Sequence, residues 1–153
     1  MVINVEIRSF RLDMPAQPKA VSRTRAPLRE MIHTWAPGHV IDDLIVCASE
    51  AVTNAITHAH HDAKLPVNVT RNETRIRIEV TDNDRRPPIL TVPPELILTG
   101  ARIPGRLLEE HGRGLFLIDA LSSRWGVRSC PEGKIVWFER DLDSRRPQAS
   151  GDR

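Results

Sequence analysis

Two polar side chains on one predicted helix are the first that could carry chemistry. The apolar residues of segment 40–59 recur at helical spacing, which predicts an amphipathic helix. Glu50 and Asn54 lie four residues apart and His58 follows at the same interval, so all three stack on its polar side. The Asn54 amide oxygen suits magnesium bound together with substrate phosphates, and the Glu50 carboxylate could take a proton from a nucleophile. For this pair taken alone, a solvated helix face is the stronger interpretation.

Further polar groups stand at the ends of other predicted elements. Asp82 follows the alternating strand 75–81, where its carboxylate could accept a hydrogen bond from an exocyclic amine such as that of adenine. The alternative is an ordinary turn residue. The segment from Gly112 to Gly114 precedes a predicted helix over 115–122, and its glycines would let backbone N–H groups approach phosphate oxygens. The alternative there is a loop that needs permissive backbone torsions.

Histidine and cysteine offer two other kinds of chemistry. His58 and His61 are three residues apart on the helix end, with His60 between them, so they could reach one metal ion. A polar helix end is the stronger interpretation of this cluster. Cys47 shares the helix face but has no base paired with it by spacing, which favours a small buried side chain. With Cys130 as its only companion, a disulfide framework is excluded.

Composition limits the partners of the chain. Its 153 residues include 22 Lys and Arg against 20 Asp and Glu, a formal net charge of +2. That balance argues against nucleic acid or an anionic membrane as the main partner. No apolar run approaches the roughly 20 residues that span a bilayer, and segment 1–10 is too polar for a signal peptide. We therefore expect a cytoplasmic protein without direct contact to nucleic acid or membrane.

The predicted elements interleave helices with hairpins. In chain order they are an edge strand over 2–12 ended by Pro15, a helix over 19–35 that Pro27 delays or kinks, the helix 40–59, a hairpin of 66–70 and 75–81, the helix 115–122, and a hairpin of 125–129 and 134–140. This order predicts an α+β fold, a two-layer sandwich whose mixed, mostly antiparallel sheet has helices on one face. We expect one domain over 1–142, with a lid at about 83–112 and a flexible tail over 143–153.

Taken together, four segments resemble the Bergerat-type (GHKL) ATP-binding family, which includes gyrase, MutL and histidine-kinase catalytic domains. The matching segments are SEAVTNAITHAH at 49–60, VTDNDRRP at 80–87, HGRGLFLIDALSSRWGV at 111–127 and GKIVWFE at 133–139. The resemblance covers roughly 10–142 and implies the two-layer fold of that family. The E-A-V-T-N form of the first segment is most similar to anti-sigma-factor serine kinases and to short regulatory ATP-binding proteins of actinomycete type.

The resemblance implies a set of ligands, roles and partners. ATP and Mg2+ would be the cofactors, and a sigma factor or an anti-anti-sigma-type antagonist would be the protein partner. A homodimer would fit as well, with the N-terminal edge strand at the interface. The implied site residues are Glu50 to activate the substrate serine, Asn54 to coordinate magnesium, Asp82 to accept from the adenine amine, and Gly112, Arg113, Gly114 and Leu115 to hold phosphates.

Other functions stay open at this stage. The family's adenine segment reads D-x-G-x-G, whereas Asp84 and Arg86 stand at the two glycine positions here. This departure favours a non-catalytic module that sequesters a partner with weak or no nucleotide binding, while Glu50 and Asn54 favour a serine kinase. A third hypothesis is a small metal-dependent hydrolase that uses His58 and His61.

Overall fold

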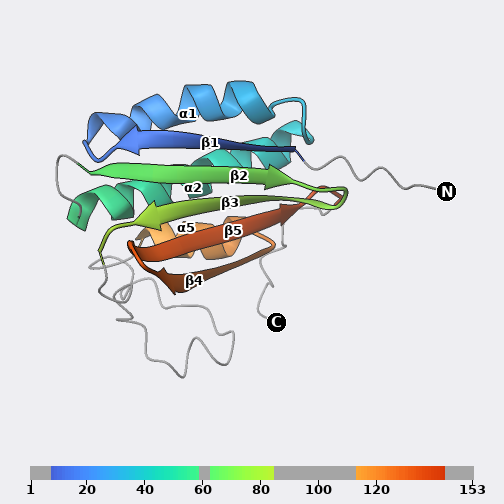
Figure 1. Cartoon of the computed structure of the whole chain (residues 1–153). Coiled ribbons are helices and arrows are strands. Elements are labelled where there is room, and N and C mark those ends of the chain that lie inside the picture. The colour runs from blue at the N-terminus through green and yellow to red at the C-terminus, as the bar shows by residue number, and fades with distance from the viewer. Residues whose placement is uncertain (1–7, 59–62, 85–112, 144–153) are drawn as a thin grey trace.

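The chain folds into a sheet that is covered by helices on one side. The computed structural model describes residues 8–58, 63–84 and 113–143, apart from the side chains of 58, 113 and 114 (Figure 1). The elements are β1 (Arg8–Pro15), α1 (Lys19–Ile32), α2 (Gly38–His58), β2 (Lys64–Arg71), β3 (Arg75–Asp82), α5 (Arg113–Leu121), β4 (Arg124–Cys130) and β5 (Gly133–Asp141). None of the helices in these ranges is long and apolar enough to cross a membrane.

The five strands form one sheet in the order β1-β2-β3-β5-β4. Each neighbouring pair runs antiparallel, so the described strands are antiparallel throughout rather than mixed. Figure 1 shows α1, α2 and α5 together behind the sheet, with α2 in the middle. The predicted α+β class, with helices on one face, is therefore confirmed.

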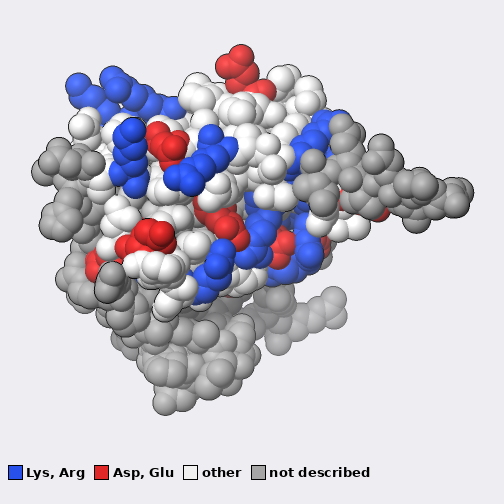
Figure 2. Space-filling view, in the orientation of Figure 1, with Lys and Arg blue, Asp and Glu red and all other residues white. Residues whose placement is uncertain are grey.

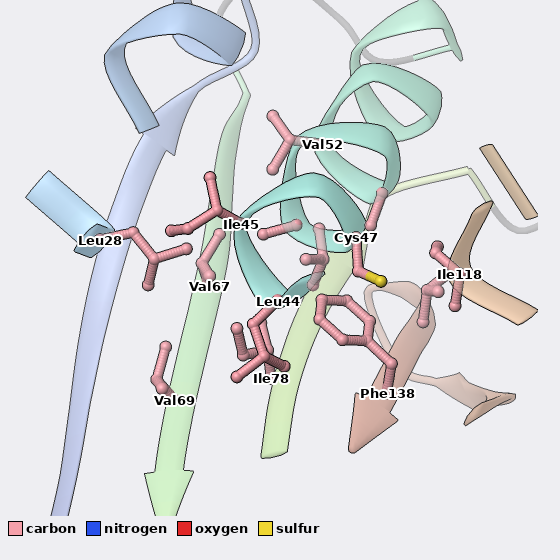
Figure 3. Close-up of a cluster of buried hydrophobic side chains, with 14 of the residues drawn as sticks. Leu28, Leu44, Ile45, Cys47, Val52, Val67, Val69, Ile78, Ile118 and Phe138 are labelled. Atoms are coloured by element: carbon pink, nitrogen blue, oxygen red, sulfur yellow. The ribbon is translucent and has the colours of Figure 1, made fainter. Parts of the chain in front are cut away.

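The core lies between α2 and the inward face of the sheet (Figure 3). Alternation along each strand sends one set of apolar side chains toward the helices, and the apolar stripe of α2 meets them. Burial of each such side chain contributes roughly 1.5–3 kcal/mol. Fully or almost fully buried members include Leu44, Val52, Val67, Val69, Ile78, Ile118 and Phe138.

The other face of the sheet is polar. Figure 2, in the same orientation as Figure 1, shows acidic and basic side chains interspersed across it. Arg77 Nε lies 2.9 Å from a Glu79 oxygen, and Arg75 Nε lies 2.8 Å from a Glu139 oxygen. The Arg77 guanidinium also stacks on the Trp137 ring, 4.2 Å from its centroid. This alternation of buried and charged faces is what an antiparallel sheet in a two-layer sandwich requires.

Two predicted boundaries, the end of β1 and the end of α1, were wrong by three residues each. β1 continues through Pro15, which pairs opposite Lys64, because an edge strand has one row of N–H groups that need no partner in the sheet. α1 starts at Lys19 and contains Pro27, so the proline does not delay the helix, which ends at Ile32 rather than at residue 35. Residues 85–112 of the predicted lid and 144–153 of the predicted tail lie outside the described residues.

Candidate functional site

The ends of four elements, α2, β3, α5 and β5, lie at one end of the sheet. Figure 1 shows the carboxyl end of α2, the end of β3 and the start of β5 together at the left edge. α5 also begins toward this edge, because β4 follows it closely and starts at the opposite end, where Arg124 pairs with Glu139. Three segments that carry sequence-predicted site residues, the second half of α2, the end of β3 and the first turn of α5, thus lead to one end of the sandwich.

Glu50 and Asn54 lie in the second half of α2, which leads to this end. Both side chains are partly buried, whereas Ala51, Val52 and Ala55 on the other side of the helix are buried in the core. The helix packs against α1, α5, β3 and β5, so its rotation about its own axis is determined by contacts on three sides. Glu50 and Asn54 therefore lie together beside the buried stripe of α2, on one face as their spacing predicts.

Asp82 is a buried carboxylate at the end of β3. The residue is 3% exposed and follows the inward-facing Ile78 and Val80. Its Oδ1 accepts the main-chain N–H of Asp84 at 2.8 Å, and its Oδ2 lies 3.4 Å from Lys134 Nζ. Burial raises the pKa of Asp82, while the Asp84 N–H bond and the Lys134 ammonium act in the opposite direction.

Two residues at the start of β5 lie against Asp82. Sequence analysis did not identify either of them as a site residue. Lys134 is the direct cross-strand neighbour of Asp82, and its Nζ also donates to the Asp84 carbonyl oxygen at 3.3 Å. Gly133 has a φ of +152°, and a Cβ there would overlap the main-chain oxygen of Asp82. The available signal was the Gly-Lys pair directly after the turn at Pro131.

The replaced glycine at Asp84 does not strain the turn. Among the described residues, no side-chain-bearing residue has a positive φ, so Asp84 needs none of the freedom that glycine provides. Its N–H instead closes a short hydrogen-bonded turn onto Asp82. Arg86, the second replacement, lies outside the described residues.

The glycine-rich segment is described in part. Arg113 and Gly114 occupy the first turn of α5, which places their backbone at a helix N-terminus, and Leu115 packs against the core. Orphan N–H groups at such a terminus favour anions. Gly112 lies outside the described residues.

The structure bears on the reactive thiol and on the histidine metal site to different extents. Cys47 is buried, and burial raises the pKa of its thiol to about 12, so the prediction of a small buried side chain is confirmed. His60 and His61 lie outside the described residues, as does the side chain of His58. Within the ranges that the structure covers, no cluster of three His, Cys, Asp or Glu side chains could hold a metal ion.

Comparison with known proteins decides the family. Residues 14–140 match the histidine kinase-like ATPase domain. The chain belongs to the histidine kinase-like ATPase family. This confirms the resemblance drawn from the four segments, and membership of the family implies the use of ATP.

Relatives of this histidine kinase-like ATPase include named kinases. It is 29% identical over 142 residues to the serine-protein kinase RsbW of Oceanobacillus iheyensis, covering 86% of this chain and 90% of that protein. It is also 29% identical over 114 residues to the serine-protein kinase RsbW of Listeria monocytogenes, covering 72% of this chain and 73% of the relative. An uncharacterized protein of Streptomyces coelicolor, SCO4941, is 39% identical over 92 residues, which is 60% of this chain and 78% of that one.

A solved structure shares the fold of this histidine kinase-like ATPase. The crystal structure of the RsbU and RsbW domains of Rv1364c from Mycobacterium tuberculosis matches with a TM-score of 0.60 at 19% identity. The match covers 91% of this chain, which spans about a third (34%) of that longer chain. It supports the fold of this chain alone.

The side chains at this end of the sheet are chemically compatible with a magnesium nucleotide. Asp82 is an acceptor-only group in a buried position, which suits an amine donor. Asn54 supplies a hard amide oxygen on α2, and the first turn of α5 supplies backbone N–H groups.

Proposed function

We propose that this chain is a regulatory serine kinase of the anti-sigma-factor type, which binds ATP with magnesium. The observation that carries the proposal is the convergence of α2, β3, β5 and α5 at one end of the sheet, together with the named kinase relatives. Its partners would be a sigma factor and an antagonist protein whose serine receives the phosphoryl group.

In this proposal, each residue has one task. Asp82 accepts a hydrogen bond from the adenine amine, and the backbone of Gly112 to Gly114, followed by Leu115, holds phosphate oxygens with Arg113 between them. Asn54 would bind magnesium, which when bound neutralises charge on the phosphates. Glu50 is the proton acceptor.

The proposed phosphoryl transfer is a displacement at the γ-phosphorus of ATP. A bond forms between the serine Oγ of the antagonist and the γ-phosphorus, and the bond from that phosphorus to the bridging oxygen of ADP breaks. ADP leaves with the electron pair, and Glu50 receives the proton of the serine hydroxyl. Because phosphoryl transfer requires little covalent chemistry from the protein, placement of these groups accounts for most of the catalysis.

The first experiment is a calorimetric titration of ATP with and without magnesium. We expect magnesium-dependent binding that Asn54→Ala weakens by about tenfold or more, the value of one lost ligand contact of about 1.4 kcal/mol. Thr53→Ala is the matched control, because Thr53 is exposed on the same helix and its hydroxyl donates to the Ser49 carbonyl oxygen at 2.8 Å. Absence of binding at millimolar ATP would overturn the proposal.

A second experiment separates the kinase from a partner-sequestering module. Asp84 and Arg86 at the family's glycine positions favour the module, so the distinction needs a direct test. Glu50→Ala should retain ATP affinity and lose transfer of labelled phosphate to a serine of a captured antagonist. If the wild-type chain binds ATP and the antagonist but transfers no phosphate, the module is the correct interpretation.

A further inference from the structure

We infer that Lys134 determines base specificity at the proposed nucleotide site, by donating a hydrogen bond to the ring nitrogen beside the adenine amine. The inference rests on the proposed function, because it requires a purine base against Asp82. It concerns a residue at the start of β5, outside the four groups to which the proposal assigns tasks.

The geometry pairs an acceptor with a donor. Asp82 and Lys134 are directly opposite each other on β3 and β5, so both side chains emerge on the helix-covered face of the sheet. The Lys134 side chain is 10% exposed and the Asp82 side chain 4%, with 3.4 Å between Nζ and Oδ2. A carboxylate oxygen and an ammonium thus stand side by side in a nearly dry position.

This pair is complementary to one edge of adenine. On that edge the 6-amino group donates and the adjacent ring nitrogen N1 accepts, so Asp82 meets the amine and Lys134 meets N1. A base with a 6-oxo group and a protonated N1, held in the same pose, would place acceptor against carboxylate and donor against ammonium. The two side chains together would therefore select adenine by its pattern of one donor and one acceptor. A lone carboxylate would test only the donor.

The described contacts of Lys134 permit this exchange. Its Nζ lies 3.3 Å from the Asp84 carbonyl oxygen and 3.4 Å from Asp82 Oδ2. Both distances are longer than the roughly 2.7–3.2 Å of a strong N–H···O bond. An ammonium is a compact charge with three rotatable donors on a flexible stem. One of these donors can therefore turn to a base nitrogen while the others keep contacts within the protein.

The test is an analogue–mutant cycle measured by calorimetry on the full chain. The probes are ATP and 1-deaza-ATP, in which carbon replaces N1 and removes the acceptor. We expect the wild type to bind ATP about tenfold or more tightly than 1-deaza-ATP, as a hydrogen bond to a charged group requires. Lys134→Met should bind both probes with similar affinity.

Two further variants keep the test decisive. Lys134→Gln retains an N–H donor without the charge and should keep part of the preference for ATP, whereas a variant with a merely weakened fold would lose affinity for both probes by the same factor and keep the full preference. Lys64→Met makes the same charge change at an exposed lysine on β2 and should keep the full preference.

Each remaining outcome counts against the inference. If Lys134→Met loses affinity for ATP and 1-deaza-ATP by the same factor, Lys134 only holds Asp82 and does not contact the base. If Lys134→Met binds ATP as the wild type does, Lys134 has no part in recognition. If the wild type binds neither probe, the proposed nucleotide site itself fails, and this result differs from both others.

Discussion

At the scale of single residues, Asp82 and Cys47 are both buried, with different consequences for their chemistry. Asp82 is compensated by a backbone N–H and an ammonium, which makes its burial tolerable. Cys47 is held among apolar side chains of the core, and Figure 3 shows it close to Phe138 and Ile118. In the proposed site the first residue would meet a ligand, whereas the second fills space in the core.

Asp82 should leave a signature in the pH dependence of stability. Burial raises its pKa above the ordinary 3.8, so the folded state retains the proton in a window where the unfolded chain has lost it. The free energy of unfolding contributed by this carboxyl is therefore highest at or below the ordinary value and falls as pH rises through the folded pKa. Asp82→Asn should remove this slope, measured by urea unfolding at several acid pH values.

Only the slope is compared in that experiment. Loss of the contact with Lys134 also changes the stability of Asp82→Asn, so the two proteins are compared by how their stability changes with pH and not by its absolute value. Parallel curves for the two proteins would contradict the assignment of a raised pKa.

Cys47 should be unreactive until the protein unfolds. A thiol pKa of about 12 leaves roughly one thiolate in ten thousand at pH about 8, and the side chain is buried as well. A thiol reagent should therefore label Cys130, which is partly exposed, in the native protein and both cysteines in denaturant. Cys47→Ala should remove only the labelling that appears in denaturant. Rapid labelling of both thiols in the native protein would contradict the burial of Cys47.

At the scale of elements, the pairing of β3 with β5 supports the proposed site. It brings Gly133 beneath the turn at Asp82 and Lys134 beside the carboxylate. Gly133 combines a left-handed φ with close backbone contact, so no other residue suits this position.

Gly133→Ala should therefore destabilise the chain, by about 1–3 kcal/mol for the backbone conformation alone. The added Cβ would also displace the Asp82 main chain. Gly38→Ala is the matched control, because a Cβ there meets nothing within 4 Å, and we expect a change within about 1 kcal/mol. Urea unfolding measures the stability of both variants. Equal losses in the free energy of unfolding would contradict the assignment of backbone strain to position 133.

At the scale of the whole molecule, an ion pair inside the sandwich joins the helix layer to the sheet. Arg140 Nη2 on β5 lies 3.1 Å from Asp43 Oδ2 on α2, and their side chains are 0% and 2% exposed. Loss of one partner from such a pair leaves a buried charge without compensation, whereas apolar replacement of both is often neutral.

A double-mutant cycle on this pair tests its role. Asp43→Leu and Arg140→Met should each lower the free energy of unfolding by about 3–5 kcal/mol, and the double variant should recover much of that loss. The exposed pair of Arg29 and Asp42, 2.7 Å apart, is the control, and Arg29→Ala should cost less than about 1 kcal/mol. Additive losses in the buried pair would show that the two charges do not compensate each other.

Much of this organisation was predictable along the chain. The 3.6-residue period of α2 placed Glu50 and Asn54 on one face, and the alternation of Ile76, Ile78 and Val80 placed β3 with one face buried. Both patterns arise from the geometry of a single element, so a local stretch of sequence contains them completely. The order of four motifs then identified the family, because each motif is contiguous.

Contacts between distant segments were decided only by the tertiary structure. The pairing of Asp82 with Lys134, the position of Gly133 under that turn, and the buried pair of Asp43 and Arg140 each join residues that lie far apart in sequence. Periodicity says which face a side chain occupies but not which strand lies beside it or in which register. Register and layer packing follow from burying all faces at once, and this collective requirement placed a lysine beside the proposed base-binding carboxylate.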